Sequence, residues 1–104
     1  MIDSNVFKAL ADPTRRAVFE QLARKEKSVR DLAAELPVSQ PAVSQHLAVL
    51  REAGLVAERR HGRFTYYRTA PDALASLAEW VDRYRVFWPE RVEKLKEILK
   101  EMDE

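Results

Sequence analysis

The sequence predicts one mainly α-helical domain that carries a small β-hairpin. Its 104 residues are enough for one hydrophobic core and too few for two ordinary domains. Apolar residues recur at helical spacing along most of the chain, whereas residues 55–69 are rich in β-branched and aromatic side chains around a glycine. Because 46% of the residues are hydrophobic and only two are glycine, the composition is that of a folded protein.

Two helices are expected at the start of the chain. Apolar side chains recur at helical spacing over residues 6–11, and Asp12 with Pro13 ends the first helix and begins a second. Asp12 has the side chain of an N-cap, and Pro13 at the first helical position has no N–H that needs a partner. The basic residues among 24–27 favour a helix end there, because cations stabilise the negative end of a helix dipole.

A third, short helix is predicted from residue 28 onward. Ser28 and Asp31 form a variant of the capping box that opens this helix. Its apolar face consists of Val29, Leu32, Ala33 and Leu36. Pro37 ends the helix, because the residue before a proline disfavours helical geometry.

A fourth helix is predicted over residues 40 to about 53. Ser39 is placed to cap its first turn, and Gly54 can end it in the left-handed conformation. A tight turn joins the third helix to the fourth. The sequence therefore predicts a helix-turn-helix over about residues 28–54.

The next segment has the pattern of a β-hairpin. The expected strands are residues 55–60 and 64–69, with a turn centred on Gly62. After Pro71, Asp72 is expected to cap a long helical stretch that Pro89 kinks or restarts, so that helices occupy about residues 72–102. A helix-turn-helix followed directly by a basic hairpin, here a wing over about residues 55–69, is typical of a winged helix-turn-helix that reads DNA.

The fourth helix carries side chains that suit the reading of bases. Its apolar face consists of Val43, Leu47 and Leu50, and its opposite face presents Gln40, Ser44, Gln45 and Ala48. Gln can bond adenine through two hydrogen bonds, Ser can bond either kind of base edge, and an Ala methyl can meet a thymine methyl. Because residues 39–49 contain no Arg or Lys, we expect a preference for operator positions that carry A·T pairs.

Positive charge is local to the hairpin. The whole chain has a formal net charge of only +1, yet four arginines and one glutamate give the hairpin +3, while residues 90–104 carry −2. An arginine at the wing tip can enter a narrow minor groove, and Arg59 and Arg60 at the base are expected to meet phosphates. The candidate DNA-binding residues are Ser39, Gln40, Ser44, Gln45, His46, Arg51, Arg59, Arg60 and Arg63. His46 can equally be a hydrogen-bonded packing residue, and the hairpin arginines can be plain solvated charges on a sheet edge.

Three stretches resemble the ArsR (arsenic-type) family of small winged-helix repressors. They are Leu10-Ala-Asp-Pro-Thr-Arg-Arg16, Val43-Ser-Gln-His-Leu-Ala-Val-Leu-Arg-Glu-Ala-Gly-Leu-Val56, and Arg59-Arg-His-Gly-Arg63 with Tyr66-Tyr67-Arg68. The resemblance implies a homodimeric repressor that dimerises through its N- and C-terminal helices. On that basis the candidate interface residues are Phe7, Leu10, Leu77, Trp80, Val81, Tyr84 and Trp88. An apolar ligand pocket is the alternative use of the aromatic stripe at residues 80–88.

The metal site of the family's metal-sensing members does not carry over. Where those relatives have a Cys-Val-Cys-Asp motif, this chain has Ser28-Val29-Arg30-Asp31, and the chain contains no cysteine. The family's other familiar site uses histidines on the helix after the wing, and residues 72–102 contain none. We therefore expect a member without a metal site or any other cofactor.

The sequence thus predicts a sequence-specific repressor that binds double-stranded DNA as a homodimer on a pseudo-palindromic operator. The alternative is a winged-helix protein interaction module that does not bind DNA. No glycine-rich phosphate loop or catalytic spacing of His and carboxylate is present, so an enzyme is not expected. With no signal peptide and no apolar run near the roughly 18 residues of a membrane span, a cytoplasmic location without a membrane partner is expected. The sequence indicates no particular small-molecule inducer.

Overall fold

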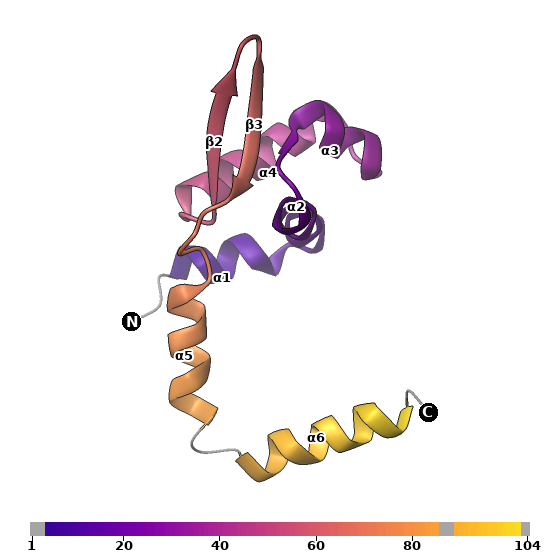
Figure 1. The fold of residues 1–104 in the computed structure, drawn as a ribbon, viewed down its shortest axis with the longest axis vertical. Helices are drawn as coiled ribbons and strands as arrows, with labels where there is room; N and C mark the ends of the chain where they lie inside the picture. The colour runs from indigo at the N-terminus through magenta and orange to yellow at the C-terminus, as the bar shows by residue number, and fades with distance from the viewer. Residues whose placement is uncertain (1–3, 86–88, 103–104) are drawn as a thin grey trace.

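The structure, a computed structural model, describes residues 4–85 and 89–102. Their helices and strands, in chain order, are α1 (Ser4–Ala11), α2 (Pro13–Arg24), β1 (Lys27–Ser28), α3 (Val29–Glu35), α4 (Gln40–Glu52), β2 (Val56–His61), β3 (Phe64–Thr69), α5 (Ala75–Arg85) and α6 (Pro89–Met102) (Figure 1). The order of helices and hairpin predicted from the sequence is confirmed. Within the described residues, no helix is long and apolar enough to cross a membrane.

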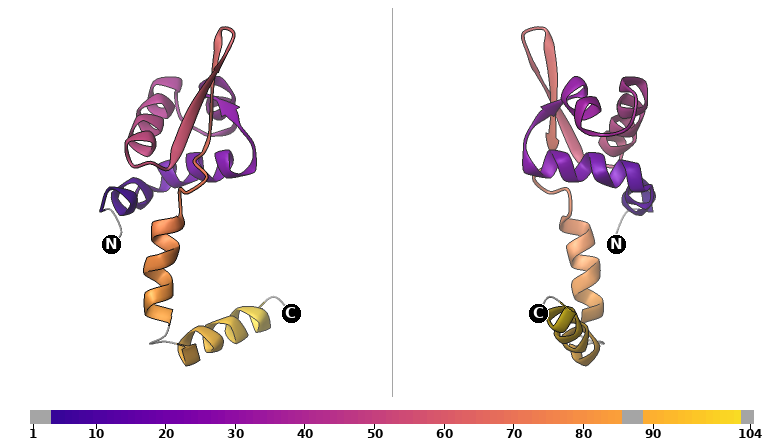
Figure 2. Two further views of the ribbon diagram at one scale, coloured as in Figure 1. Left: turned by 60° about the vertical axis from the view of Figure 1, so that its left-hand side comes forward. Right: turned by 90° about the vertical axis from the view of Figure 1, so that its right-hand side faces the viewer.

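The helices that precede the hairpin pack around one core. Side chains from α1 to α4 and from the start of β2 fill it, and the bulkiest of those wholly removed from solvent are Leu32, Leu47, Leu50, Leu55, Val18 and Val43. The β2–β3 hairpin projects past these helices, and α5 leaves the core on the opposite side (Figures 1 and 2). The end of the hairpin therefore extends beyond the helical core.

The caps expected from the sequence are present. The Asp12 carboxylate accepts the backbone N–H of Arg15 at 3.0 Å, and Ser28 and Asp31 exchange both hydrogen bonds of the capping box. The Ser39 hydroxyl accepts the backbone N–H of Ala42 at 3.2 Å. These caps fix where α2, α3 and α4 begin, because they satisfy backbone donors that a helix leaves free in its first turn.

Gly54 ends α4 as predicted, with a φ of +76°. The N–H of Leu55 bonds the carbonyl of Leu50 at 2.9 Å, and the N–H of Gly54 bonds that of Arg51 at 3.0 Å. This is the Schellman arrangement, which needs a residue at positive φ. Because Leu55 is thereby part of the helix end, β2 begins at Val56, one residue later than expected.

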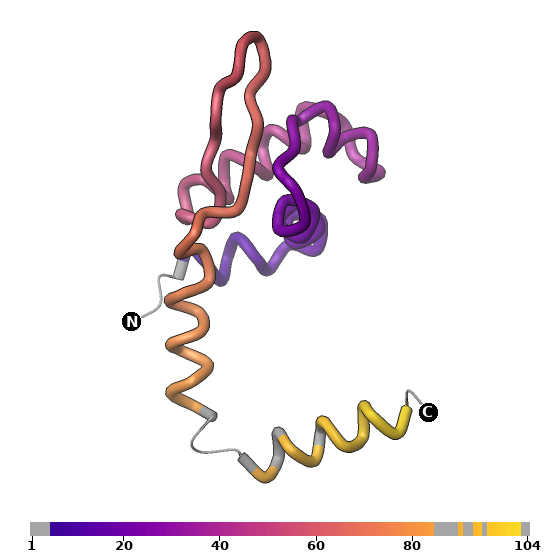
Figure 3. The backbone as a smooth tube through the Cα atoms, in the orientation of Figure 1, coloured from indigo at the N-terminus to yellow at the C-terminus, as the bar shows by residue number. Residues whose placement is uncertain are grey.

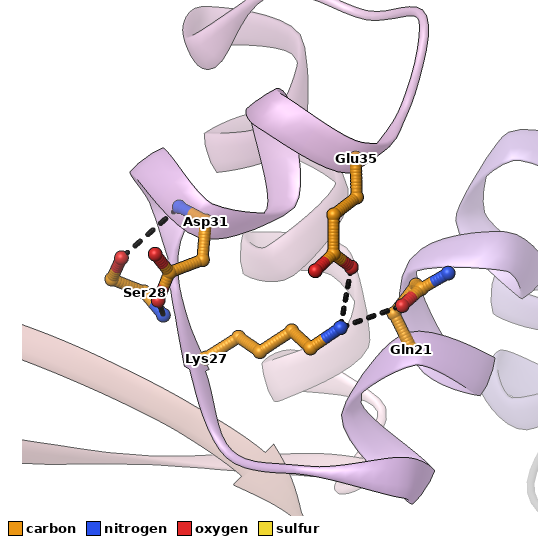
Figure 4. A network of polar contacts seen from close by, with 5 residues as sticks. All are labelled: Gln21, Lys27, Ser28, Asp31 and Glu35. Carbon is orange, nitrogen blue, oxygen red and sulfur yellow. Dashed lines mark hydrogen bonds and ion pairs between the residues drawn. The ribbon is translucent and has the colours of Figure 1, made fainter.

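Strand β1 was missed by the sequence analysis. Lys27 and Ser28 pair with Tyr67 and Tyr66, so β3 lies between β1 and β2 in a three-stranded antiparallel sheet. Two residues are too few to show an alternating pattern, and Lys27 stood in a run interpreted as a helix end. Its Nζ instead donates to the Gln21 side chain at 2.6 Å and to the Glu35 carboxylate, so this mostly buried cation joins α2 to α3 (Figure 4).

The expected helix cap at Asp72 is wrong. Residues 71–74 form turns in which the N–H of Ala73 bonds the carbonyl of Ala70 and the N–H of Ala75 bonds that of Asp72, so α5 begins at Ala75. Ala73 is buried in the core, which holds this segment against the domain before the helix starts. The chain thus returns to the side of α1 (Figure 3). There the Phe7 and Trp80 rings meet edge to face, with their centroids 5.4 Å apart.

Candidate nucleic-acid interface

The outer face of α4 is polar and open to solvent. Val43, Leu47 and Leu50 are buried, which confirms the predicted apolar face. The opposite face exposes Gln40, Ser44, Gln45 and Ala48. Ser39 caps the helix with its oxygen, and the hydroxyl proton remains able to donate to a phosphate oxygen. The first two turns of α4 therefore present hydrogen-bonding groups that the core does not use.

His46 lies at the edge of this face and is half-buried. The pKa of the Asp12 carboxyl is lowered mainly by the hydrogen bond from the Arg15 backbone N–H, and the nearby His46 adds a smaller electrostatic contribution. His46 therefore lies near Asp12, at the start of α2.

The tip of the wing is a two-residue turn at Gly62 and Arg63. Gly62 has a φ of +64°, and the strands pair on either side through His61 and Phe64. A glycine at positive φ in the first central position is what a type II′ hairpin turn requires. The turn leaves the Arg63 side chain exposed at the end of the wing.

The two faces of the wing carry different charged residues. Glu58 on β2 lies 3.0 Å from Arg51 of α4, so the face that carries Glu58 is directed toward α4. Because side chains alternate along a strand, Arg60 lies on the same face as Glu58, and Arg59 lies on the other. The sequence analysis assigned Arg59 and Arg60 the same role at the base of the wing. In the structure, Arg60 lies on the face of the wing that is turned toward α4, and Arg59 lies on the opposite face.

Arg59 already has a carboxylate partner. Its Nε donates to Oε2 of Glu26 at 3.1 Å, its Nη2 pairs with Oε1, and its guanidinium lies over the Tyr66 ring with the carbon 5.4 Å from the centroid. The hydrogen bond from Arg59 lowers the pKa of Glu26, and the same bond raises the pKa of Arg59. Both groups are therefore ionised at neutral pH.

Arg60 and Arg63 are exposed, and neither forms a hydrogen bond or ion pair with the residues that the structure describes. Two further arginines, Arg68 on β3 and Arg30 on α3, are also exposed and form no side-chain hydrogen bond or ion pair with the described residues. Neither was among the DNA-binding residues predicted from the sequence. Arg30, Arg63 and Gln40 line one hollow of about 480 Å³ between the start of α3, the start of α4 and the wing. Only the tertiary fold brings Arg30 to this place, so no local sequence pattern signals it.

The described part of the chain contains no group of three or more His, Cys, Asp or Glu side chains that could hold a metal ion. Ser28 and Asp31, the first and last residues of the segment compared above with a Cys-Val-Cys-Asp motif, are engaged in the α3 cap. The Ser28 hydroxyl accepts the Asp31 N–H at 3.1 Å, and the Asp31 carboxylate accepts the Ser28 N–H at 3.2 Å. The hydrogen bond from the Ser28 backbone N–H to the Asp31 carboxylate is the main reason that the pKa of Asp31 is lowered.

The candidate dimer residues fall into two groups. Phe7, Trp80, Val81 and Tyr84 are exposed between 37% and 46%, and the Trp80 ring contacts those of Phe7 and Tyr84. Leu10 and Leu77 are half-buried, and Leu10 packs against the core of its own chain. Trp88 lies outside the described residues. An apolar patch therefore runs from α1 onto α5.

Comparison with known sequences finds regulators. Residues 12–58 match the family "Bacterial regulatory protein, arsR family". An HTH-type transcriptional regulator of Mycobacterium tuberculosis, Rv2034, is 50% identical over 78 residues, which cover 75% of this chain and 73% of that protein. The transcriptional repressor SdpR of Bacillus subtilis is 35% identical over 78 residues, covering 75% and 87%.

Solved structures agree over most of the chain. An ArsR-like transcriptional regulator from Rhodococcus sp. RHA1 has a TM-score of 0.74 at 36% identity, covering 91% of this chain and 90% of that one. A homodimeric winged helix-turn-helix DNA-binding domain from Mycobacterium bovis, Mb0332, has a TM-score of 0.66 at 32% identity, covering 80% of each. With the helix-turn-helix, the wing and these matches in agreement, the chain belongs to the ArsR family of bacterial transcriptional regulators.

Proposed function

We propose that this chain represses transcription by binding a pseudo-palindromic operator as a homodimer. The observation that carries the proposal is the polar outer face of α4 beside a wing on which Arg60 and Arg63 form an ion pair with no carboxylate of residues 4–85 and 89–102. In this arrangement α4 enters the major groove, and the wing follows the flanking backbone. One half-site offers few base contacts, each contributing about 1–3 kcal/mol of discrimination, so a second subunit supplies the rest.

The polar residues of α4 have separate roles in this proposal. Gln40, Ser44 and Gln45 read base edges, and Ser39 contacts a phosphate while it caps the helix. His46 positions α4 against the start of α2. Arg60 and Arg63 contact the backbone and the minor groove. Arg51 and Arg59 each pair with a carboxylate of the chain, so neither is assigned a phosphate contact.

The dimer is proposed to form through α1 and the C-terminal helices, with Phe7, Trp80 and Tyr84 at its centre. The exposed aromatic patch supports this use, because apolar surface of this kind marks association sites. A structural neighbour, the Mycobacterium bovis domain, is homodimeric, which supports the formation of a dimer. Two reading helices related by a two-fold axis predict half-sites about 10 base pairs apart.

We also propose that the regulator works in the cytoplasm, catalyses no reaction and needs no metal. Ser28 and Asp31 cap the first turn of α3, which supports a structural role for these side chains and not the binding of a metal. Titration of the protein–operator complex with zinc or cadmium salts is expected to leave the affinity unchanged. Release of DNA at stoichiometric metal would contradict this part of the proposal.

Selection from a random duplex library with the purified protein tests the whole proposal. The expected result is a two-fold symmetric site with A·T pairs at the positions read by α4, bound with an affinity that falls steeply with salt. Half-sites made only of G·C pairs would contradict the assigned reading residues. A chain that selects no duplex even at low salt would instead favour the winged-helix interaction module.

A further inference from the structure

The three-stranded part of the sheet ends at one row of residues. In this row Ser28 of β1 pairs with Tyr66 of β3, which pairs with Arg59 of β2. Toward the tip the chain after Ser28 turns into α3, so the wing continues as two strands only. An isolated two-stranded hairpin is marginally stable in water. The direction of the wing therefore depends on what holds it at this last row.

The Glu26–Arg59 ion pair crosses the sheet at this position. Glu26 directly precedes β1, Arg59 belongs to β2, and the Tyr66 ring under the guanidinium belongs to β3 between them. Two parallel N–H···O contacts between a guanidinium and a carboxylate fix orientation better than a single contact does. The pair and the ring thus connect all three strands on the face that is turned away from α4.

A small rotation at this row has a large effect at the tip. Strands rise about 3.3 Å per residue, so Gly62, three residues after Arg59, lies about 10 Å beyond the last three-stranded row, and a tilt of about 15° displaces it by about 2.6 Å. This displacement is close to the length of a hydrogen bond between an arginine and a phosphate, so it is enough to break one. Arg60 and Arg63 therefore reach a fixed place on DNA only if the base of the wing is fixed.

We infer that Glu26, Arg59 and Tyr66 form a brace that sets the direction of the wing, with Arg59 a positioning residue and not a phosphate ligand. The inference rests on the proposed function, since the brace serves Arg60 and Arg63 in DNA binding. It also predicts a property of the free protein, namely an ordered wing.

Measurement of operator affinity across salt concentrations distinguishes positioning from contact. Arg59→Gln and Glu26→Gln are each expected to weaken binding about three- to tenfold with the wild-type salt dependence, while Arg60→Ala flattens the slope of log affinity against log salt by about 0.9. The charge-reversed pair E26R/R59E restores the ion pair but not the cation over the Tyr66 ring, so it is expected to bind more tightly than R59E alone and less tightly than the wild type. A flatter slope in Arg59→Gln, or no rescue by the reversed pair, overturns the inference. Tighter binding by Glu26→Gln overturns it as well, since Glu26 would then compete with DNA.

Hydrogen exchange of the protein without DNA supplies an independent test. Glu26→Gln is expected to speed exchange of the paired amides in β2 and β3 about three- to tenfold, the effect of losing an ion pair and its ring contact. Glu93→Gln, which breaks an exposed pair with Lys96 on α6, is the matched control and should leave these amides unchanged. Unchanged exchange in Glu26→Gln overturns the brace. If the wild-type protein binds no duplex, the proposed function fails and this measurement still decides the brace.

Discussion

The Arg51 guanidinium lies 3.0 Å from the Glu58 carboxylate, so an ion pair joins the last turn of α4 to the first strand of the wing. The side chains are 54% and 41% exposed, and a pair this open contributes less than about 1 kcal/mol to folding. Its main effect is on charge. Because Glu58 compensates the cation of Arg51, we expect Arg51 to add little to the attraction of DNA.

Arg51→Ala is therefore predicted to leave the salt dependence of operator binding close to that of the wild type. Arg60→Ala removes an arginine without a partner among the described residues and is predicted to flatten the salt slope by about 0.9. Fluorescence anisotropy titrations at several salt concentrations measure both slopes. An equal flattening in the two variants would show that DNA takes Arg51 away from Glu58.

Glu35→Gln is predicted to destabilise the fold by about 1–2 kcal/mol, because it removes the only charged partner that the structure gives to the Lys27 ammonium among the described residues. Lys27 is 11% exposed, whereas Glu35 is 45% exposed, so the effect should stay below that of a fully buried pair. Urea unfolding measures the difference. Glu20→Gln, at an exposed position on α2, is the control and should change the free energy of unfolding by less than about 0.5 kcal/mol.

Local signals explain which parts of the fold could be predicted. Asp12, Ser28, Ser39 and Gly54 act on backbone groups a few residues away, and each cap or helix end inferred from them is confirmed. Strand β1 could not be predicted in this way. It forms because the chain before α3 runs beside β3, and this pairing joins residues that are far apart in the sequence.

In the candidate site, too, the features set by neighbouring residues could be predicted, and the contacts between distant residues could not. The exposed face of α4 follows from the helical period of its own sequence, so its polar residues were found. Glu26 and Arg59 are 33 positions apart, and no periodicity relates them. The sequence could identify Arg59 as a cation on the wing, but only the folded chain shows that Glu26 is its partner.

The Asp12 cap is predicted to make stability depend on pH in acid. Its pKa is lower in the folded chain than the usual 3.8, chiefly because the carboxylate accepts the Arg15 N–H. The stabilisation is therefore complete above the unfolded value and is lost as the pH falls through the folded one. Asp12→Asn keeps an oxygen that can cap α2 but does not titrate, so its stability should fall less between about pH 4 and pH 2 than that of the wild type. Urea unfolding at each pH measures this, and parallel curves would contradict the prediction.

Gln45→Ala is predicted to relax operator specificity at one base pair per half-site. The side chain is exposed on the polar outer face of α4, and a bidentate contact to adenine contributes about 1–3 kcal/mol of discrimination. Competition between the selected operator and single-base variants measures the change. Arg63→Ala should weaken all these duplexes by a similar factor, so a loss of affinity in Gln45→Ala that is uniform across sequences would remove its assigned role.

Trp80→Ala is predicted to weaken the homodimer by about 30-fold or more, the effect of truncating an aromatic residue at the centre of an interface. Trp80 is 37% exposed in the single chain and contacts both Phe7 and Tyr84, so the truncation opens the middle of the aromatic patch. Sedimentation equilibrium gives the dissociation constant, and circular dichroism checks that the variant stays folded. Glu79→Ala changes the adjacent exposed position and is expected to remain dimeric. Operator affinity should fall with dimerisation, because a single subunit contacts only one half-site. A folded Trp80→Ala that dimerises as the wild type does would place the interface elsewhere.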